Sequence, residues 1–180
     1  METLDDSGQR LRIREERATD AAAIAALVEA AFGQPDEAEL VAALRRAGAL
    51  TLSLVALVDD AIVGHVAFSP VTIAGAEAAT RGALGLAPMA VAPSWQRRGV
   101  GLRLIADALD RLRAAGCPAV VVLGHPHYYP RAGFVRASRF GLRWEHDAPD
   151  EAFMALELRP GALAGAGGIV RFHPAFAAVS

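Results

Sequence analysis

The spacing of apolar residues in the first part of the chain predicts one strand followed by two helices. Residues 11–15 alternate apolar and polar side chains, which is typical of a half-buried strand. Thr19 is a good N-cap, and apolar residues recur at helical spacing from there to Gly33. Pro35 suits the first turn of a second helix, where acidic residues face the positive helix end, and Gly48 ends that helix.

The middle of the chain contains longer apolar runs that predict three strands. Residues 50–58 are almost uniformly apolar, as in a buried strand, and residues 61–73 form a second strand. A third strand covers residues 82–91. It is interrupted by Pro88, which cannot donate a hydrogen bond to a neighbouring strand.

The last part of the chain alternates helical and strand patterns. An amphipathic helix follows the glycine-containing turn at residues 96–101 and ends at Gly116. Residues 119–123 are fully apolar, as in a strand from the interior of a sheet. We expect a short helical turn over residues 127–132 and a last core strand over residues 153–158.

The order of these elements, β-αα-βββ-α-β-α-β, predicts an α/β fold with a mixed sheet. A chain of 180 residues fits one domain, and its sequence contains no internal repeat. We expect a flexible N-terminus over residues 1–10, a domain over residues 11–158 and a C-terminal extension over residues 159–180. Residues 169–172 of the extension are predicted to add an edge strand.

Composition and charge narrow the classes of partner. Apolar residues make up 53% and charged residues 21% of the chain, an ordinary globular balance. A net charge of -2 gives no global attraction to nucleic acid or to an acidic membrane. Cys117 is the single cysteine, which excludes an intramolecular disulfide and a four-cysteine zinc site and suits a reducing compartment. No signal peptide or spanning segment is found, so we expect a cytoplasmic protein.

The most specific chemical signal is the turn from Gln96 to Gly101. Gly99 and Gly101 let the backbone approach a bulky anion closely, and the free N–H groups of the following helix point toward it. Arg97 and Arg98 add positive charge. A helix entry that merely needs small residues is the alternative, but it does not explain two arginines beside two glycines. The turn is therefore predicted to hold a diphosphate.

Two motifs together resemble one family. The turn reads Gln-x-x-Gly-x-Gly and matches neither the triphosphatase nor the dinucleotide glycine pattern. It resembles the signature of the GNAT superfamily of N-acetyltransferases. Residues 124–134 resemble the later motif of that family, in which a tyrosine, here Tyr129, lies four residues before a Gly-Phe pair. Together with Gly64-His65 and Ser69-Pro70, the sequence of this later motif resembles that of a bacterial subgroup of mostly uncharacterised small acetyltransferases.

The resemblance implies a fold, a cosubstrate and a set of binding residues. The fold is a single-domain, three-layer α/β arrangement in which helices flank a mixed, centrally splayed sheet. The cosubstrate is acetyl-CoA, and no metal is implied. Its pantetheine arm pairs with the main chain of the strand before the turn, and the turn holds the pyrophosphate. The implied binding residues are Met89, Ala90, Val91, Gln96, Arg97, Arg98, Gly99, Val100 and Gly101.

The resemblance also implies a general acid. In the family, a tyrosine near the thioester sulfur protonates the leaving thiolate, and the matching residue here is Tyr129. The alternative is a core aromatic residue whose hydroxyl is hydrogen-bonded. Tyr128 is adjacent, so only the register of the motif separates the two tyrosines.

The general base is not assigned by the resemblance. Many members of the family carry a glutamate on the strand before the turn, but residues 83–87 contain no acid. The candidates are Glu37 and His65, as base or substrate contacts, and His125 or His127 near the tyrosine. The simpler interpretations are a first-turn helix charge for Glu37 and a hydrogen-bonded buried histidine for His65.

These observations lead to two functional hypotheses and a remote third. The first is an enzyme that moves an acetyl group from acetyl-CoA to a primary amine of a small molecule or peptide. The alternative is a non-catalytic acyl-CoA-binding sensor on the same fold, which the missing strand glutamate favours. A nucleotide-binding regulator ranks last, because the turn lacks lysine and serine or threonine at the required places. The sequence identifies neither the acceptor nor the oligomeric state, and it is compatible with a homodimer.

Overall fold

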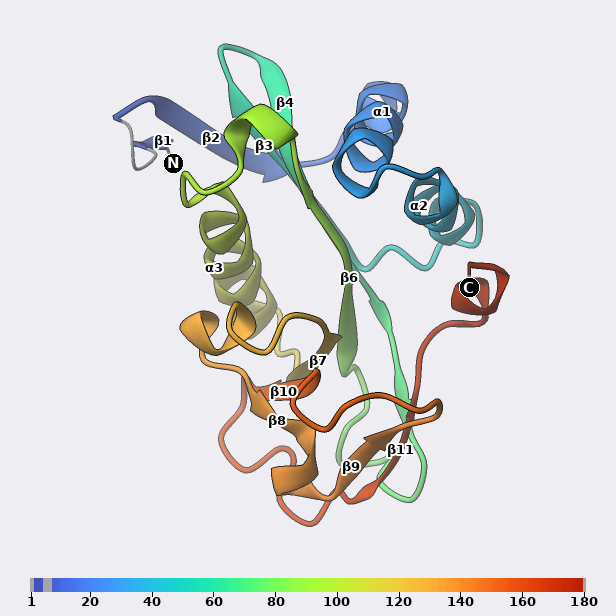
Figure 1. Ribbon diagram of the computed structural model, residues 1–180. Coiled ribbons are helices and arrows are strands. Elements are labelled where there is room, and N and C mark those ends of the chain that lie inside the picture. Colours follow the sequence, from blue (N-terminus) through green and yellow to red (C-terminus); the bar gives the residue numbers. More distant parts are fainter. Residues whose placement is uncertain (1, 5–7, 180) are drawn as a thin grey trace. The chain divides into compact units, whose positions relative to one another are not determined.

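The computed structural model describes residues 2–4 and 8–179, which fall into two units (Figure 1). The first unit takes its described residues from Met1–Phe68, Pro88–Ala108 and Pro174–Ser180. The second unit takes Ser69–Ala87 and Leu109–His173. Strand β6 and helix α3 contribute residues to both units, and each unit is described below by itself.

Antiparallel strands form the sheet of the first unit. Strand β1 (Glu2–Leu4) pairs with β2 (Arg10–Glu15), β2 pairs with β3 (Leu52–Val58), and β3 pairs with β4 (Ala61–Pro70). Residues of β1 are thus paired with β2, whereas the flexibility expected of residues 1–10 stays a prediction. The predicted strands at β2, β3 and β4 are present.

Helices cover both faces of this sheet (Figure 1). Helix α1 (Ala21–Phe32) and helix α2 (Asp36–Arg46) pack on one face, and Gly33 ends α1 in a left-handed conformation with φ 74°. On the other face, Gly64 leaves room for side chains of α3 (Val100–Ala114). The core between α1, α2 and the sheet contains Ile24, Val28, Ala38, Val41, Val55, Leu57 and Ala90.

The second unit carries the mixed part of the sheet. Strand β6 (Leu84–Val91) runs parallel to β7 (Ala119–Leu123), β7 pairs antiparallel with β10 (Phe153–Glu157), and β10 pairs with β8 (Val135–Arg136). Among the described residues, pairing between β6 and β7 is confined to Leu84 and Gly85. The predicted mixed sheet is confirmed, and the expected splay of its centre stays a prediction.

A small second sheet corrects the prediction for the C-terminal extension. Strand β11 (Gly168–Arg171) lies between β5 (Thr72–Ile73) and β9 (Leu142–Trp144), so it is a middle strand and not an edge strand. The reason is that β11 pairs with β5 on one side and with β9 on the other. The sequence pattern did not predict either of these two short strands as a separate element. The sheet packs on an apolar core that includes Ile73, Val121, Phe153 and Leu163.

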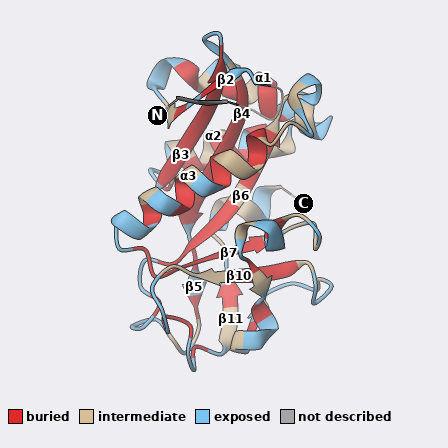
Figure 2. Cartoon of the chain, turned by 90° about the vertical axis from the view of Figure 1, so that its left-hand side faces the viewer, coloured by how far each residue is buried: buried red, intermediate tan, exposed pale blue. Residues whose placement is uncertain are grey.

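Short 3-10 helices complete both units. They comprise η1 (Ala18–Asp20) and η2 (Pro93–Trp95) in the first unit, and η3 (Tyr129–Ala132) and η4 (Ala137–Phe140) in the second. The last, η5 (Pro174–Ala178), belongs again to the first unit. Figure 2 shows that the strands are mostly buried, whereas each long helix has one buried and one exposed side. In the described part of the chain, no helix combines the length and apolarity needed to cross a bilayer.

Candidate active site

The predicted anion-binding turn lies between β6 and α3, in the first unit. After η2 the backbone is extended at Gln96, turns left-handed at Arg97 with φ 61°, and is left-handed again at Gly99 with φ 78°. A positive φ is uncommon for a residue with a side chain, so Arg97 marks a backbone shape held by its surroundings. Alternation of this kind turns successive N–H groups toward a common side, as in backbone nests that bind anions.

The start of α3 adds the helix end to this turn. The carbonyl oxygen of Gly99 accepts the N–H of Arg103 at 3.1 Å, so Gly99 lies where a cap residue lies. The first N–H groups of a helix have no partner within the helix and carry its positive dipole end. The side chain of Gln96 donates to the carbonyl oxygen of Val91 at 3.1 Å and ties the turn to the end of β6.

Arg98 is the better anchored of the two arginines. Its guanidinium lies 4.8 Å from the ring centroid of Trp95, within cation–π range, and its Nη1 donates to Gln9 Oε1 at 3.4 Å. Arg97, by contrast, is exposed. The turn thus combines left-handed backbone, a helix N-terminus and two cations, which is the arrangement predicted for a diphosphate.

The end of β6 supplies the predicted pantetheine-binding segment. Met89 and Val91 are half-buried, whereas Ala90 between them is buried in the core under α1 and α2. The N–H of Ala92 donates to the carbonyl oxygen of Val63 at 2.9 Å, so this end of β6 is attached to β4. Pro88, in the middle of β6, lacks the N–H that a continuing ladder would use.

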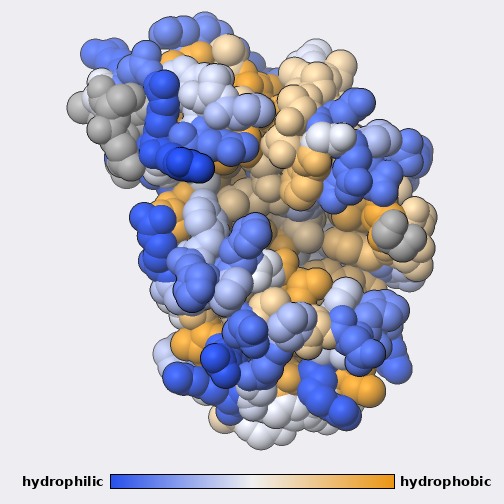
Figure 3. Space-filling view, in the orientation of Figure 1, coloured by the Kyte–Doolittle hydropathy of each residue, from blue (hydrophilic) through white to orange (hydrophobic). Residues whose placement is uncertain are grey.

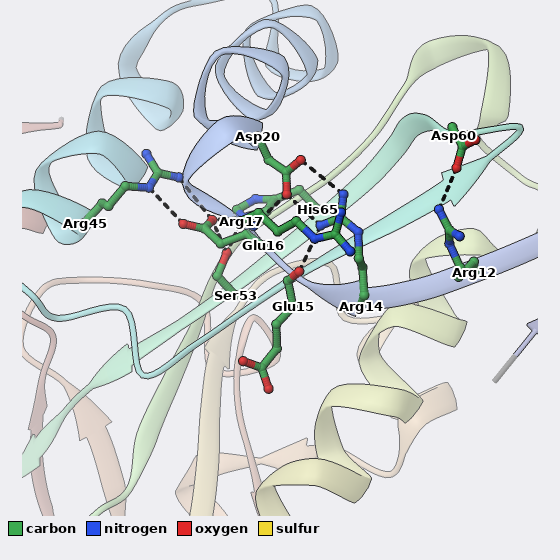
Figure 4. A network of polar contacts seen from close by, with 10 residues as sticks. All are labelled: Arg12, Arg14, Glu15, Glu16, Arg17, Asp20, Arg45, Ser53, Asp60 and His65. Carbon is green, nitrogen blue, oxygen red and sulfur yellow. Dashed lines mark hydrogen bonds and ion pairs between the residues drawn. The ribbon is translucent and has the colours of Figure 1, made fainter.

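His65 belongs to a buried polar network that sequence analysis did not anticipate (Figure 4). Its Nε2 lies 2.8 Å from Ser53 Oγ, and the same hydroxyl donates to Glu16 Oε2 at 2.5 Å. Arg45, on α2, donates two hydrogen bonds to the Glu16 carboxylate, at 2.8 Å and 3.1 Å. Figure 4 shows side chains from α2, β3 and the segment after β2 converging beside the histidine.

The hydrogen bonds assign the tautomer of His65. Glu16 is an ionised carboxylate and can only accept, so the single proton of the Ser53 hydroxyl goes to it. The Ser53 oxygen therefore accepts from Nε2–H of a neutral His65, and Nδ1 carries the lone pair. In the described part of the chain no group donates to Nδ1, although the side chain is 0% exposed.

Burial and charge set the protonation states of this network. Burial lowers the pKa of His65, and the attraction of Glu16 offsets only part of that effect. For Glu16, burial alone would raise the pKa. The His65 ring, whose Nε2 lies 3.7 Å from Glu16 Oε2, the hydrogen bonds from Arg45 and Ser53, and the charge of Arg45 together outweigh it and hold the pKa of the carboxyl well below its usual range. The network is thus a neutral histidine beside a charged Glu16–Arg45 pair.

The other base candidates lie at the surface. Glu37 is half-buried in the first turn of α2 and accepts hydrogen bonds from Gln34 Nε2 at 3.2 Å. In Figure 3 the neighbouring surface of α1 is apolar, and Phe32 at its end is 42% exposed. His125 and His127 are exposed in the second unit. The described residues contain no group of three side chains suited to a metal.

Tyr129 lies in the second unit and is 8% exposed. Its ring meets the rings of Tyr128 and Phe134 edge-on, with centroid distances of 5.2 Å and 5.8 Å. Burial, reinforced by Tyr128, raises the pKa of the Tyr129 phenol, which keeps the proton on the oxygen at neutral pH. Tyr128 is only half-buried, so the two neighbouring tyrosines have different surroundings.

The structure therefore groups the predicted residues by unit. The phosphate turn, the end of β6, Glu37 and His65 belong to the first unit, and Tyr129 belongs to the second. Sequence analysis missed Glu16, Arg45 and Ser53. One signal was available, because Ser53 is a polar residue within an otherwise apolar strand.

Comparison with known proteins gives consistent matches. A family model described as "Acetyltransferase (GNAT) domain" matches residues 12–137. The chain is 39% identical over 165 residues to "Uncharacterized N-acetyltransferase YhbS" of Escherichia coli K12. That alignment spans 91% of this chain and 97% of the relative.

Two solved structures have the same fold and substantial identity. The complex of Escherichia coli YhbS with CoA superposes with a TM-score of 0.88 at 38% identity, covering 94% of this chain and 93% of that chain. The complex of a GNAT family acetyltransferase from Brucella melitensis with acetyl-CoA has a TM-score of 0.76 at 42% identity, covering 92% and 97%. The predicted α/β fold, with a mixed sheet and flanking helices, is confirmed by these likenesses.

Proposed function

The chain belongs to the GNAT family of N-acetyltransferases, and we propose that it transfers the acetyl group of acetyl-CoA to a primary amine of a small molecule or peptide. The observation that carries the proposal is the left-handed backbone at Arg97 and Gly99 opening α3, which suits a pyrophosphate. The relatives bound to CoA and acetyl-CoA support the same cosubstrate.

The proposal gives each part of the first unit a binding role. The turn from Gln96 to Gly101 holds the pyrophosphate through backbone N–H groups, Arg97 and Arg98. The main chain of Met89, Ala90 and Val91 pairs with the pantetheine arm as an added strand. The shortness of the β6–β7 ladder, which among the described residues pairs Leu84 and Gly85, supports this role.

The reaction requires one proton to leave the amine and one to reach the sulfur. The amine nitrogen bonds to the thioester carbon, a backbone N–H of β6 stabilises the oxyanion, and the carbon–sulfur bond then breaks. Tyr129 donates its proton to the departing thiolate and regains one from solvent. Because its raised pKa exceeds that of a thiol, this proton transfer is uphill, and the acid is less effective than one of matched pKa. We therefore expect a contribution near about 10²-fold, the lower end for positioned acids.

Two of the candidates for the proton acceptor of the amine, His65 and Glu37, lie in the first unit. His65 has a neutral ring and a lone pair on Nδ1, but it is fully buried. Glu37 is accessible on α2 but is hydrogen-bonded to Gln34. Replacing each by glutamine separates them, because only the loss of the true base slows a lysine-like amine more than an aniline. A lysine-like amine, with a pKa of about 10.4, is almost fully protonated at neutral pH.

The experiment that tests the function is an acceptor screen. Purified protein is mixed with acetyl-CoA and a panel of α-amines, lysine-like amines and anilines, and release of the CoA thiol is followed. Amine-dependent release, with acetylated amine as product, is expected. Release that needs no amine would contradict the N-acetyltransferase. No release would favour the non-catalytic acyl-CoA sensor, which the lack of an acid in the β6 segment 84–87 also favours.

A further inference from the structure

The ring of Tyr129 lies directly against the backbone of Gly124. A Cβ atom built on Gly124 would be 2.3 Å from Cε2 of that ring, 3.0 Å from Cδ2 and 3.3 Å from Cζ. The contact with Cε2 is shorter than real Cβ atoms show and the other two are tight, so any other residue at position 124 must displace something. All three nearest atoms belong to Tyr129, so this ring is the first group that a side chain at position 124 would meet.

The backbone at Gly124 has little freedom to withdraw. Its N–H donates to the carbonyl oxygen of Ala152 at 2.9 Å. It directly follows β7, whose residues Ala119–Leu123 are each paired with a residue of β10. A shift of Gly124 away from the ring would break this end of the β7–β10 ladder.

The ring has little freedom to withdraw either. Tyr128 and Phe134 meet it edge-on, and the residue is 8% exposed. Its own backbone is fixed in η3, where its carbonyl oxygen accepts the N–H groups of Gly133 and Phe134. The ring of Tyr129 is therefore packed against the rings of Tyr128 and Phe134 and against the backbone of Gly124, which has no side chain.

We propose that Gly124 is a positioning residue for Tyr129, and that its lack of a side chain fixes where the phenolic hydroxyl lies. The role in catalysis depends on the proposed function of Tyr129 as the acid, whereas the packing itself does not. A side chain at position 124 tilts the ring and moves the hydroxyl. Misplacing a catalytic group by about 1 Å can cost about 10²-fold in rate, so the substitution should cost as much as removing the hydroxyl.

A double-mutant cycle tests the catalytic role. Gly124→Ala, Tyr129→Phe and the double variant are compared for kcat and for KM of acetyl-CoA. We expect each single variant to lose about tenfold to hundredfold in kcat with KM little changed. The double variant should be no slower than Tyr129→Phe, because no hydroxyl remains to be misplaced. Multiplicative losses would overturn the proposal.

The chain has two tyrosines, which allows a readout independent of activity. With ring-labelled tyrosine, the NMR signals of Tyr129 should shift in Gly124→Ala, because the ring moves relative to Tyr128 and Phe134. Unchanged signals would overturn the proposal, as would shifted signals with unchanged kcat. If the wild-type protein acetylates no amine, the proposed function fails, and these signals still decide whether Gly124 seats the ring.

A stability cycle covers the case in which Gly124→Ala is too unstable to assay. In a Tyr129→Ala background the ring is gone, so adding Gly124→Ala should no longer lower the midpoint of thermal unfolding. An equal loss in both backgrounds would place the conflict elsewhere and overturn the proposal.

Discussion

Among single residues, His65 shows how neighbours fix a protonation state. It lies two residues from Val63, in a mostly apolar strand, and burial alone would favour a neutral ring. The Ser53 hydroxyl donates its hydrogen bond to Glu16, so its oxygen can only accept from His65, which requires the Nε2–H form. The side chain thus presents one satisfied and one unsatisfied nitrogen, which differs from the simpler expectation of a fully hydrogen-bonded buried histidine.

The lowered pKa of His65 predicts a pH dependence of stability. In the unfolded chain the imidazole titrates near its ordinary pKa of about 6.5, so below that pH the unfolded state binds more protons. The free energy of unfolding should be fully retained above that value. It should fall by up to about 1.4 kcal/mol per pH unit as the pH drops from 6.5 toward 5.

Urea unfolding of the wild type and of His65→Gln at several pH values measures this effect. Because glutamine does not titrate, the free energy of unfolding of the variant should change less with pH between 6.5 and 5 than that of the wild type. Loss of the Glu16 contribution belongs to a more acidic range, where carboxylates protonate. Parallel profiles between pH 7 and 5 would show that His65 is not a low-pKa group.

Among single residues, Tyr129 is the one whose substitution we expect to affect catalysis. Tyr129→Phe keeps the ring between Tyr128 and Phe134 but removes the hydroxyl, so kcat should fall by about tenfold to hundredfold. The affinity for acetyl-CoA should change little. Steady-state kinetics with an acceptor from the screen, together with calorimetric affinity, measures both quantities. Tyr128→Phe is the matched control, and equal losses in the two variants would contradict the assignment.

Among secondary-structure elements, long periodic segments were predictable and short paired ones were not. The helical spacing after Thr19 and after Pro35 corresponds to α1 and α2, and residues 119–123 correspond to β7. Strands β8 and β9, of two and three residues, were missed, because such short strands depend on their partners and not on periodicity. The predicted strand over residues 61–73 is split into β4 and β5 for the same reason.

The buried network escaped prediction for a related reason. Its members Glu16, Arg45, Ser53 and His65 are separated by 12 to 37 residues along the chain where they are hydrogen-bonded. Nothing in local pattern joins them, and only the antiparallel pairing of β3 with β4 brings Ser53 and His65 to one face. The phosphate turn was predictable because its residues are contiguous.

The packing of β4 against α3 predicts the effect of a side chain at Gly64. A Cβ atom there would lie 2.9 Å from Leu104 Cδ1 and 3.0 Å from Val100 Cγ1. Gly64→Ala should therefore destabilise the chain by about 1–3 kcal/mol through overpacking, although alanine restricts the unfolded chain and by itself stabilises. The midpoint of thermal unfolding should drop.

A matched control exists in the same strand. Ala61, at the exposed start of β4, should tolerate Ala61→Val with little change in the midpoint. A higher midpoint for Gly64→Ala would mean that α3 leaves room for the methyl group, contrary to the observed contacts.

In the molecule as a whole, the C-terminal segment returns from the second unit to the first. After β11, Phe176 of η5 and the following Val179 pack against a cluster that includes Leu40 and Leu44 of α2. Phe176→Ala should lower the free energy of unfolding by about 1–3 kcal/mol, less than a fully buried phenylalanine because this one is half-buried. Urea unfolding measures the loss. Ala178→Ser, at an exposed position of η5, is the control, and equal stabilities would mean that η5 does not hold α2.

The most direct test of the central claim is calorimetric titration of acetyl-CoA into the wild-type protein and into Gly99→Glu. The new side chain would fill the turn and place a carboxylate where the pyrophosphate is proposed to bind. Gly116→Glu is the matched control, because Gly116 also has a left-handed backbone, with φ 80°, and has open space around it. ATP is titrated in parallel as a competing nucleotide.

We predict micromolar binding of acetyl-CoA to the wild type and to Gly116→Glu, no binding to Gly99→Glu, and no binding of ATP. Circular dichroism should show that all three proteins are folded. Equal affinity for acetyl-CoA in Gly99→Glu and the wild type would mean that the turn from Gln96 to Gly101 does not hold the pyrophosphate, and would contradict the proposed site.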